Sequence, residues 1–141
     1  MASARSIVFV CLHGAAKSVI AATYLNRLST KRGLQLRAAA AGIEPESEVP
    51  PHVCEGLLSD GLDVRRYRPR RVTPEELTAA WRVVSFGCDV GEIASSSLEV
   101  ERWDDVPLVS EGFAAARDAI VARVHRLLDG YECEGRPASR Q

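Results

Sequence analysis

The sequence predicts an α/β protein with three layers, in which a four-stranded parallel sheet carries helices on both faces. Two observations lead to this prediction. Short apolar runs alternate along the chain with longer segments whose apolar residues recur at helical spacing, and this alternation is typical of parallel sheets. The first run is continuously apolar, as expected for a strand that is buried on both faces. The predicted strands span residues 6–10, 34–41, 82–86 and 98–103.

Four helices are predicted between and after these strands, and their ends carry recognisable signals. Ser18 can accept a hydrogen bond from a first-turn amide, so it is the expected N-cap of the first helix, which Gly33 should end. Pro51 suits the first turn of the second helix. Thr73 and Glu76 form a capping-box pattern at the start of the third. The predicted helices span residues 18–31, 51–59, 73–81 and 113–128.

The length and composition indicate one ordinary globular domain. The chain has 141 residues, of which 46% are hydrophobic and 26% are charged, so it can bury a substantial core. We expect a single domain over residues 1–133 and a flexible tail over residues 134–141, with fraying from Tyr131 onward.

The charge and the cysteines exclude several classes of function. A net charge of −1 argues against nucleic acid or a membrane as a partner. No apolar run approaches the roughly 20 residues of a membrane helix, and the first residues lack a signal-peptide pattern, so we expect a cytoplasmic protein. The four cysteines have no C-x-x-C spacing, so no metal site, disulfide framework or cofactor is predicted. The sequence makes no prediction about oligomeric state.

The stretch from Cys11 to Ser18 reads Cys-Leu-His-Gly-Ala-Ala-Lys-Ser and joins the first predicted strand to the first predicted helix. A loop of small residues that leads into a helix directs several backbone N–H groups into one concavity, and the helix dipole adds positive potential there. The same field favours the thiolate form of Cys11, which is the nucleophilic form. The alternative is that Cys11 is a buried small hydrophobic residue. The loop and the helix start favour the nucleophile.

Two further groups are candidates for the same site. Ligands of parallel sheets bind beyond the carboxyl ends of the strands, and both the thiol loop and the Asp104-Asp105 loop follow predicted strands. Either aspartate can act as the general acid that protonates a leaving oxygen; the alternative is a solvated turn. Lys17 is either a ligand of an oxyanion or an ordinary solvated lysine, and its place at a helix start favours the ligand.

Cys11, five residues and then Lys17-Ser18 resembles the Cys-x5-Arg-Ser/Thr loop of the low-molecular-weight protein tyrosine phosphatases and of the arsenate reductases built on the same fold. The stretches AAAGIEP at 39–45, GLD at 61–63 and WDDVP at 103–107 resemble further family motifs in the same order. The resemblance implies the low-molecular-weight phosphatase-like fold.

The resemblance also implies a mechanism. The Cys11 thiolate attacks phosphorus, the loop amides hold the equatorial oxygens, and water hydrolyses a cysteinyl-phosphate intermediate. The Ser18 hydroxyl stabilises the thiolate, and the Asp104-Asp105 loop lies where the family has its general acid. The family's aspartate directly precedes a proline; Val106 intervenes here, and we favour Asp105 as the counterpart. The implied substrate-binding residues are Leu12, His13, Gly14, Ala15, Ala16 and Ser18.

Three positions depart from the family pattern. Lys17 replaces the arginine, so the positive charge is kept but the bidentate grip on two oxygens is lost. Gly14 replaces an asparagine that braces the loop, and Ala16 replaces a second cysteine that many phosphatases carry.

Three activities therefore remain open. The first is a tyrosine phosphatase-like hydrolase of phosphate monoesters that is weakened by Lys17. The second is an arsenate reductase that uses an external thiol, since His13 beside the thiol is shared with some such enzymes. The third is a catalytically impaired module that binds oxyanions or phosphoproteins. The expected ligand is in each case phosphate, arsenate or a phosphotyrosine-type anion.

Two other features have both a functional and a purely structural interpretation. Cys88, after the third predicted strand, is near where thiol-linked arsenate reductases keep a resolving cysteine, but a buried structural thiol is the interpretation we favour. The arginine-rich stretch at 65–71 either steers an anionic substrate or forms a solvated surface, and runs of this kind are mostly solvated.

Overall fold

The computed structural model describes residues 5–88 and 99–135, and within them the three-layer α/β prediction is confirmed. Four parallel strands lie in the order β2-β1-β3-β4. The strands are β1 (Arg5–Cys11), β2 (Leu36–Gly42), β3 (Arg82–Ser85) and β4 (Val100–Arg102). The helices are α1 (Lys17–Arg32), α2 (Pro51–Ser59), α3 (Pro74–Ala79) and α4 (Phe113–Gly130).

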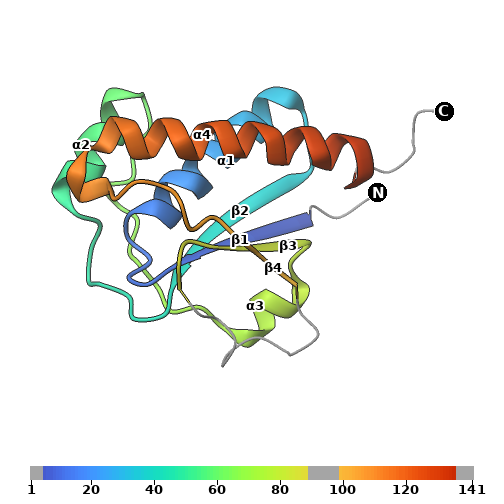
Figure 1. Cartoon of the computed structure of the whole chain (residues 1–141), viewed down its shortest axis with the longest axis horizontal. Coiled ribbons are helices and arrows are strands. Elements are labelled where there is room, and N and C mark those ends of the chain that lie inside the picture. Colours follow the sequence, from blue (N-terminus) through green and yellow to red (C-terminus); the bar gives the residue numbers. More distant parts are fainter. Residues whose placement is uncertain (1–4, 89–98, 136–141) are drawn as a thin grey trace.

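The sheet separates two hydrophobic cores, because successive side chains of a strand point to opposite faces. Ile7, Phe9 and Cys11 of β1 belong to the larger core, which α1, α2 and α4 cover (Figure 1). Val8 and Val10 belong to the smaller core on the side of α3. β1 is buried on both faces, which explains its continuously apolar sequence.

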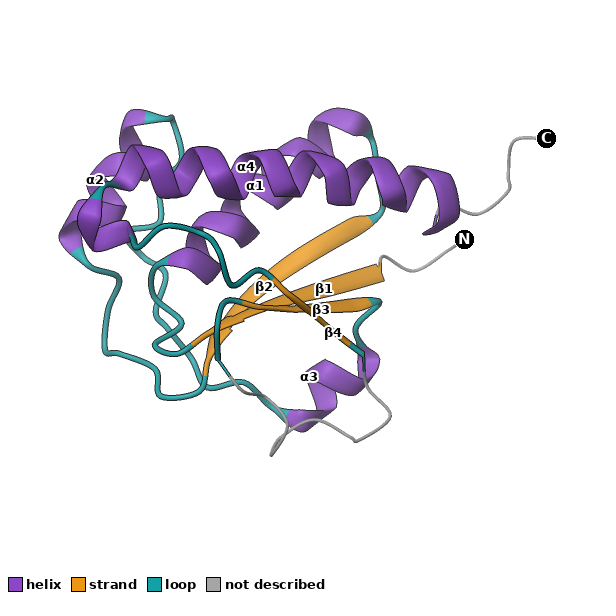
Figure 2. Ribbon diagram, in the orientation of Figure 1, coloured by secondary structure: helices purple, strands orange, loops and turns teal. Residues whose placement is uncertain are grey.

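The loops that follow the carboxyl ends of the strands gather at one end of the sheet (teal in Figure 2). One of them begins at Trp103, directly after β4, and this residue anchors the loop because it is 2% exposed. Its ring packs against Phe9 and Phe86, with ring centres 5.6 and 5.5 Å apart. This aromatic cluster therefore packs the start of the loop after β4 against the central strand, β1.

The ends of the helices confirm some predictions and correct others. Gly33 adopts a left-handed conformation with φ of 71° as the C-cap of α1, and Thr73 and Glu76 form the expected capping box at α3. Ser18 is not the N-cap, because α1 begins at Lys17 and the side chain of Ser18 turns toward Cys11 instead.

The end of the chain also differs from the expectation of fraying at Tyr131. α4 continues into a π-helical turn, Tyr131–Gly135, and the Tyr131 side chain is 3% exposed. The ring packs edge-on against Trp81 at 5.0 Å, and its hydroxyl donates to the Gln35 carbonyl. The prediction failed because a buried aromatic contact across the domain is not visible in the local pattern. Residues 136–141 lie outside the described part, so the flexible tail stays a prediction.

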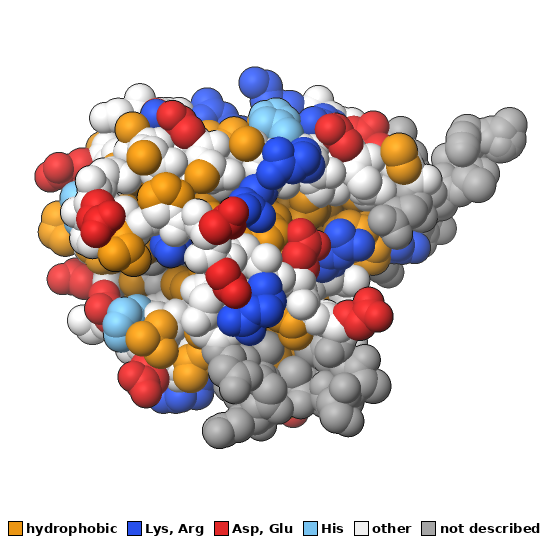
Figure 3. Space-filling view, viewed as in Figure 1, with side chains coloured by type: hydrophobic (Ala, Val, Ile, Leu, Met, Phe, Trp, Pro, Cys, Tyr) orange, Lys and Arg blue, Asp and Glu red, His pale blue; other side chains and the backbone are white. Residues whose placement is uncertain are grey.

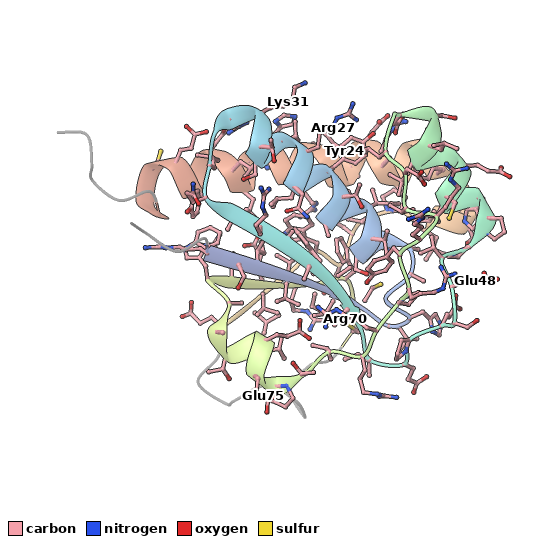
Figure 4. The ribbon with its side chains drawn as sticks, turned by 180° about the vertical axis from the view of Figure 1, so that it is seen from behind. Tyr24, Arg27, Lys31, Glu48, Arg70 and Glu75 are labelled. Atoms are coloured by element: carbon pink, nitrogen blue, oxygen red, sulfur yellow. The ribbon has the colours of Figure 1, made fainter. Side chains whose placement is uncertain are left out.

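A polar network joins α1, α2 and α4, and Figure 4 labels its member on α1, Tyr24. The carboxylate of Asp60, which caps α2, accepts hydrogen bonds from Tyr24 of α1 and Arg117 of α4. Burial and this hydrogen bond raise the pKa of Tyr24 to about 12. Burial alone would raise the pKa of Asp60, but the hydrogen bonds from Tyr24 and Arg117 outweigh it and lower that pKa. The network therefore holds Asp60 ionised at neutral pH.

The arginine-rich stretch serves mainly structural contacts. Arg70 makes two hydrogen bonds to Glu76 at 2.9 and 2.6 Å, and Arg65 pairs with Asp63 at 2.8 Å. Arg71 donates to the Ile43 carbonyl. These contacts give no support to a role in steering a substrate. The face of the molecule in Figure 3 likewise carries acidic and basic side chains intermixed, without a large area of one sign.

No helix among the described residues combines the length and the apolar character that crossing a bilayer requires.

Candidate active site

The loop between β1 and α1 is braced from outside by the chain that follows β2. Three backbone amides of that segment donate to carbonyls of the loop: Ile43 to Cys11 at 3.3 Å, Glu44 to Leu12 at 2.7 Å, and Glu46 to His13 at 3.1 Å. The carbonyls of Cys11, Leu12 and His13 are thereby directed toward residues 43–46. Backbone contacts with the segment after β2 thus hold this part of the loop.

Two glycines let the loop rest directly on the end of β2. Gly14 has φ of 61°, and a Cβ atom placed on it would lie 2.7 Å from the Gly42 nitrogen. A Cβ atom on Gly42 would lie 2.6 Å from the Gly14 nitrogen. This close approach of two backbones braces the loop at the position where the resemblance led us to expect an asparagine.

The amides of the loop are free to bind a ligand. Within residues 5–88 and 99–135, none of the main-chain amides of residues 12–17 donates to a protein acceptor. The amide of Lys17, the first residue of α1, belongs to this set, and the positive end of the helix dipole lies at the same place. The loop thus offers a row of donors and a favourable potential for an anion.

Cys11 is the last residue of β1, and its sulfur faces the first turn of α1. The residue is 8% exposed, and its Sγ is 3.0 Å from the hydroxyl oxygen of Ser18, which is fully buried. A hydroxyl at this distance can donate to a thiolate. The contact also explains why Ser18 does not cap α1, since its side chain faces the sulfur.

A cavity of about 330 Å³ opens over the loop. The loop contributes Cys11, Leu12, His13, Ala15, Ala16 and Lys17 to its lining. The other lining residues come from distant segments and are Glu46, Pro50, His52, Phe86, Leu108, Val109 and Ser110. Leu12 and Leu108 are 46% and 54% exposed, so the mouth of the cavity has an apolar wall.

Lys17 connects the loop to the segment after β4. Its Nζ donates to the Val106 carbonyl at 3.0 Å. An ammonium group has three donors, so this bond leaves two for another acceptor. The predicted convergence of the thiol loop and the aspartate loop on one rim is confirmed by this contact.

The carboxylates of Asp104 and Asp105 are not brought into the cavity. Asp104 pairs with Arg102 at 2.9 Å, and Asp105 pairs with Arg123 of α4. The two side chains are 51% and 75% exposed, and neither lines the cavity. The structure therefore places the expected general acids beside the site and paired with arginines.

Glu46 and His52 also line the cavity, although the sequence analysis assigned neither of them to a site. Glu46 follows β2 and His52 lies in the first turn of α2, and neither belongs to a local pattern that indicates a site. The two residues reach the cavity because the segment after β2 packs against the loop, and the sequence pattern does not show this packing.

Cys88 packs as a buried thiol, in agreement with the interpretation we favoured. It belongs to the smaller core with Val8 and Val10, whereas Cys11 belongs to the larger core on the other face. Burial raises the pKa of the Cys88 thiol. Among the described residues Cys88 does not line the cavity, so the redox relay gains no support. The described part of the chain also holds no group of three side chains suited to a metal ion.

Comparison with known proteins assigns the chain to a family. A family model described as low molecular weight phosphotyrosine protein phosphatase matches residues 6–105. The chain belongs to this family. Membership agrees with the resemblance found in the sequence, and the similar proteins include both phosphatases and arsenate reductases.

The chain is similar in sequence to one curated protein and in fold to two solved structures. A Halobacterium salinarum protein named "Putative arsenate reductase" is 27% identical over 128 residues, which are 87% of this chain and 90% of that protein. A low molecular weight phosphotyrosine phosphatase of Vibrio cholerae has the same fold, with a TM-score of 0.80, 16% identity, and coverage of 94% of this chain and 99% of that chain.

A thioredoxin-dependent arsenate reductase of Corynebacterium glutamicum also shares the fold, with a TM-score of 0.74 and 24% identity. The match covers 94% of this chain but 64% of that reductase, so this chain spans about two thirds of its length.

Proposed function

We propose that this member of the phosphatase family hydrolyses phosphate monoesters through a cysteinyl-phosphate intermediate. The observation that carries the proposal is that Cys11 lines an open cavity together with a loop whose main-chain amides, at residues 12–17, make no hydrogen bond to the described part of the protein. A tetrahedral dianion placed there meets the nucleophile and the hydrogen-bond donors together.

Each loop residue has a role in this proposal. The Cys11 thiolate, stabilised by the Ser18 hydroxyl, attacks phosphorus. The backbone amides of Leu12, His13, Gly14, Ala15, Ala16 and Lys17 bind the equatorial oxygens. The Lys17 ammonium adds positive charge where the oxyanion develops. The apolar wall formed by Leu12 and Leu108 suits a leaving group such as an aryl alcohol.

Arsenate reduction with an external thiol is the second candidate. Arsenate is also a tetrahedral oxyanion, so the same loop can bind it. Two of the proteins compared above carry the name arsenate reductase. Because Cys88 lies outside the cavity lining, a reductase built on this site would draw its second thiol from another molecule.

Two assays distinguish these candidates. Steady turnover of p-nitrophenyl phosphate, with a phosphoryl group trapped on the peptide that contains Cys11, is the expected result. Consumption of thiols that depends on arsenate, without ester turnover, would instead favour the reductase. Binding of inorganic phosphate with neither activity would show a catalytically impaired binding module and would contradict the proposal.

Replacing Lys17 tests its role directly. Lys17→Met removes both the charge and the hydrogen bond to Val106, and we expect kcat/KM for p-nitrophenyl phosphate to fall about 100-fold, as when one oxyanion donor is lost. Lys17→Arg should raise turnover, because a guanidinium can bind two oxygens at once.

The matched control is Lys31→Met, since Lys31 is exposed on the same helix (Figure 4) and outside the cavity lining. If Lys17→Met and Lys31→Met behave alike, Lys17 does not act on the oxyanion.

A further inference from the structure

We infer that the protein has a second ligand site, at the outer edge of β2, which binds a small carboxylate with a compact apolar body. This site is separate from the cavity over Cys11, since the linings of the two cavities share no residue. It goes beyond the proposed function and does not depend on it.

A cavity of about 250 Å³ opens beside β2, which is an edge strand of the sheet. α1, β2 and the segment 63–67 enclose it. The volume suits a molecule about the size of one ring and a substituent. Much of the lining is aliphatic and comes from Val19 and Ala22 of α1, Ala38 and Ala40 of β2, and Val64.

The outer edge of β2 is covered by hydrogen bonds that replace a neighbouring strand. The Asn26 side chain of α1 bonds both main-chain groups of Ala38, donating to its oxygen at 3.0 Å and accepting from its nitrogen at 2.7 Å. Gly42 is bonded in the same way by residues 70–72, at 2.9 and 3.0 Å. The edge is thereby closed on both sides of Ala40.

The amide of Ala40 is an exception to this cover. The Ala40 carbonyl accepts from the Tyr67 hydroxyl at 3.1 Å, so this residue also turns its main-chain groups away from β1. Its N–H has no acceptor among the residues that the structure describes. Ala40 is 5% exposed and lines the cavity. A buried amide without an acceptor costs free energy, so a ligand that offers an acceptor gains affinity here.

Arg66 supplies a positive charge to the same lining. Its side chain is exposed, and it makes no hydrogen bond or ion pair with another described residue. Asp63 also lines the cavity, but its carboxylate accepts from two nitrogens of Arg65 at 2.9 and 2.8 Å. These bonds are the main reason why the pKa of Asp63 lies well below its usual range. Arg65 therefore compensates Asp63, and Arg66 is left to attract an anionic ligand.

A carboxylate on an apolar body matches both features. One of its oxygens can accept from the Ala40 amide and the other can pair with the Arg66 guanidinium, while the body packs on the aliphatic lining. A phosphate dianion matches less well, because the aliphatic side chains would desolvate its oxygens without offering donors.

The test uses benzoate as the probe and the full chain as the protein. A two-dimensional ¹H–¹⁵N titration is run in excess inorganic phosphate, which occupies the loop at residues 12–17. We expect saturable binding in the millimolar range, with the largest shift at the Ala40 amide. Benzamide has the same shape without the charge and should bind about threefold more weakly, as for the loss of one exposed ion pair.

Variants separate the two contacts. Arg66→Gln should raise the Kd for benzoate about threefold. Arg37→Gln is the matched control, because this arginine is exposed on the same strand and outside the lining. Ala40→Pro removes the N–H without removing a bond of the sheet and should abolish binding. Ala38→Leu should fill the cavity and have the same effect, which keeps the test decisive if Ala40→Pro does not fold.

The other outcomes overturn the inference. No saturable shift at Ala40 would show that water alone satisfies this amide. Shifts confined to residues 12–17 would place benzoate in the cavity over Cys11. Equal Kd values for Arg66→Gln and Arg37→Gln, or binding retained in Ala38→Leu, would show that this cavity does not hold the carboxylate. Ester turnover is not part of the readout, so the proposed function stands or fails separately.

Discussion

Replacing Cys11 with serine should abolish the turnover of phosphate esters, lowering kcat by on the order of 10⁴-fold or more. A serine hydroxyl stays protonated at neutral pH and is a poor nucleophile without an adjacent base. The substitution is nearly isosteric, so the contact with Ser18 and the binding of phosphate should both persist. The loss therefore reports chemistry and not the loss of the site.

The measurement is single-turnover release of p-nitrophenol by wild type and Cys11→Ser, alongside phosphate binding by calorimetry. Cys54→Ser is the matched control, because this thiol on α2 is half-buried and outside the cavity lining. Activity retained in Cys11→Ser, or lost equally in Cys54→Ser, would contradict the assignment of the nucleophile.

Replacing Gly14 with alanine should have the second largest effect, because the new methyl group has no room. Its Cβ would lie 2.7 Å from the Gly42 nitrogen and 2.9 Å from the Gly42 Cα, both of which are backbone atoms. The left-handed conformation costs alanine on the order of 1–2 kcal/mol in addition. We expect the loop to shift away from β2, and a displacement of about 1 Å can cost 100-fold in rate.

Gly33→Ala separates the steric effect from the conformational one. Gly33 has φ of 71°, close to the 61° of Gly14, but nothing lies within 4 Å of an added Cβ. We expect Gly33→Ala to lower the free energy of unfolding by on the order of 1–2 kcal/mol while kcat/KM stays unchanged. Gly14→Ala should lower both quantities, as measured by urea unfolding and by ester turnover. An active Gly14→Ala variant would show that the contact with Gly42 does not position the loop.

The parts of the fold that were predictable are those with local signals. The apolar run of β1 predicted the buried central strand, and Thr73 with Glu76 predicted the capping box of α3. The prediction that Ser18 is the N-cap of α1 was wrong. A serine near a helix start satisfies the pattern of a cap, but the Cys11 sulfur lies 3.0 Å from its hydroxyl and the two side chains face each other. Whether the Ser18 hydroxyl bonds to an amide of the first helical turn or to the Cys11 sulfur depends on how the loop folds, which the local pattern does not show.

Some features of the candidate site could likewise be predicted from the sequence, and others could not. Cys11 and the loop of small residues could be recognised, because the strand, loop and helix are contiguous in the chain. The pairing of Asp105 with Arg123, the hydrogen bond from Lys17 to Val106, and the place of Glu46 could not. Each of these depends on a partner or a segment that is remote in sequence.

The sequence by itself determined the order of strands and helices and the position of a thiol before a helix start, since hydrophobic periodicity and end signals act over a few neighbouring residues. Only the tertiary structure decided which groups line the cavity together with Cys11. It placed His13 and Glu46 together in the cavity lining and left both aspartates in ion pairs outside it. The physical reason is that these contacts arise where the ends of separate strands converge, and their geometry depends on the packing of the whole sheet against its helices.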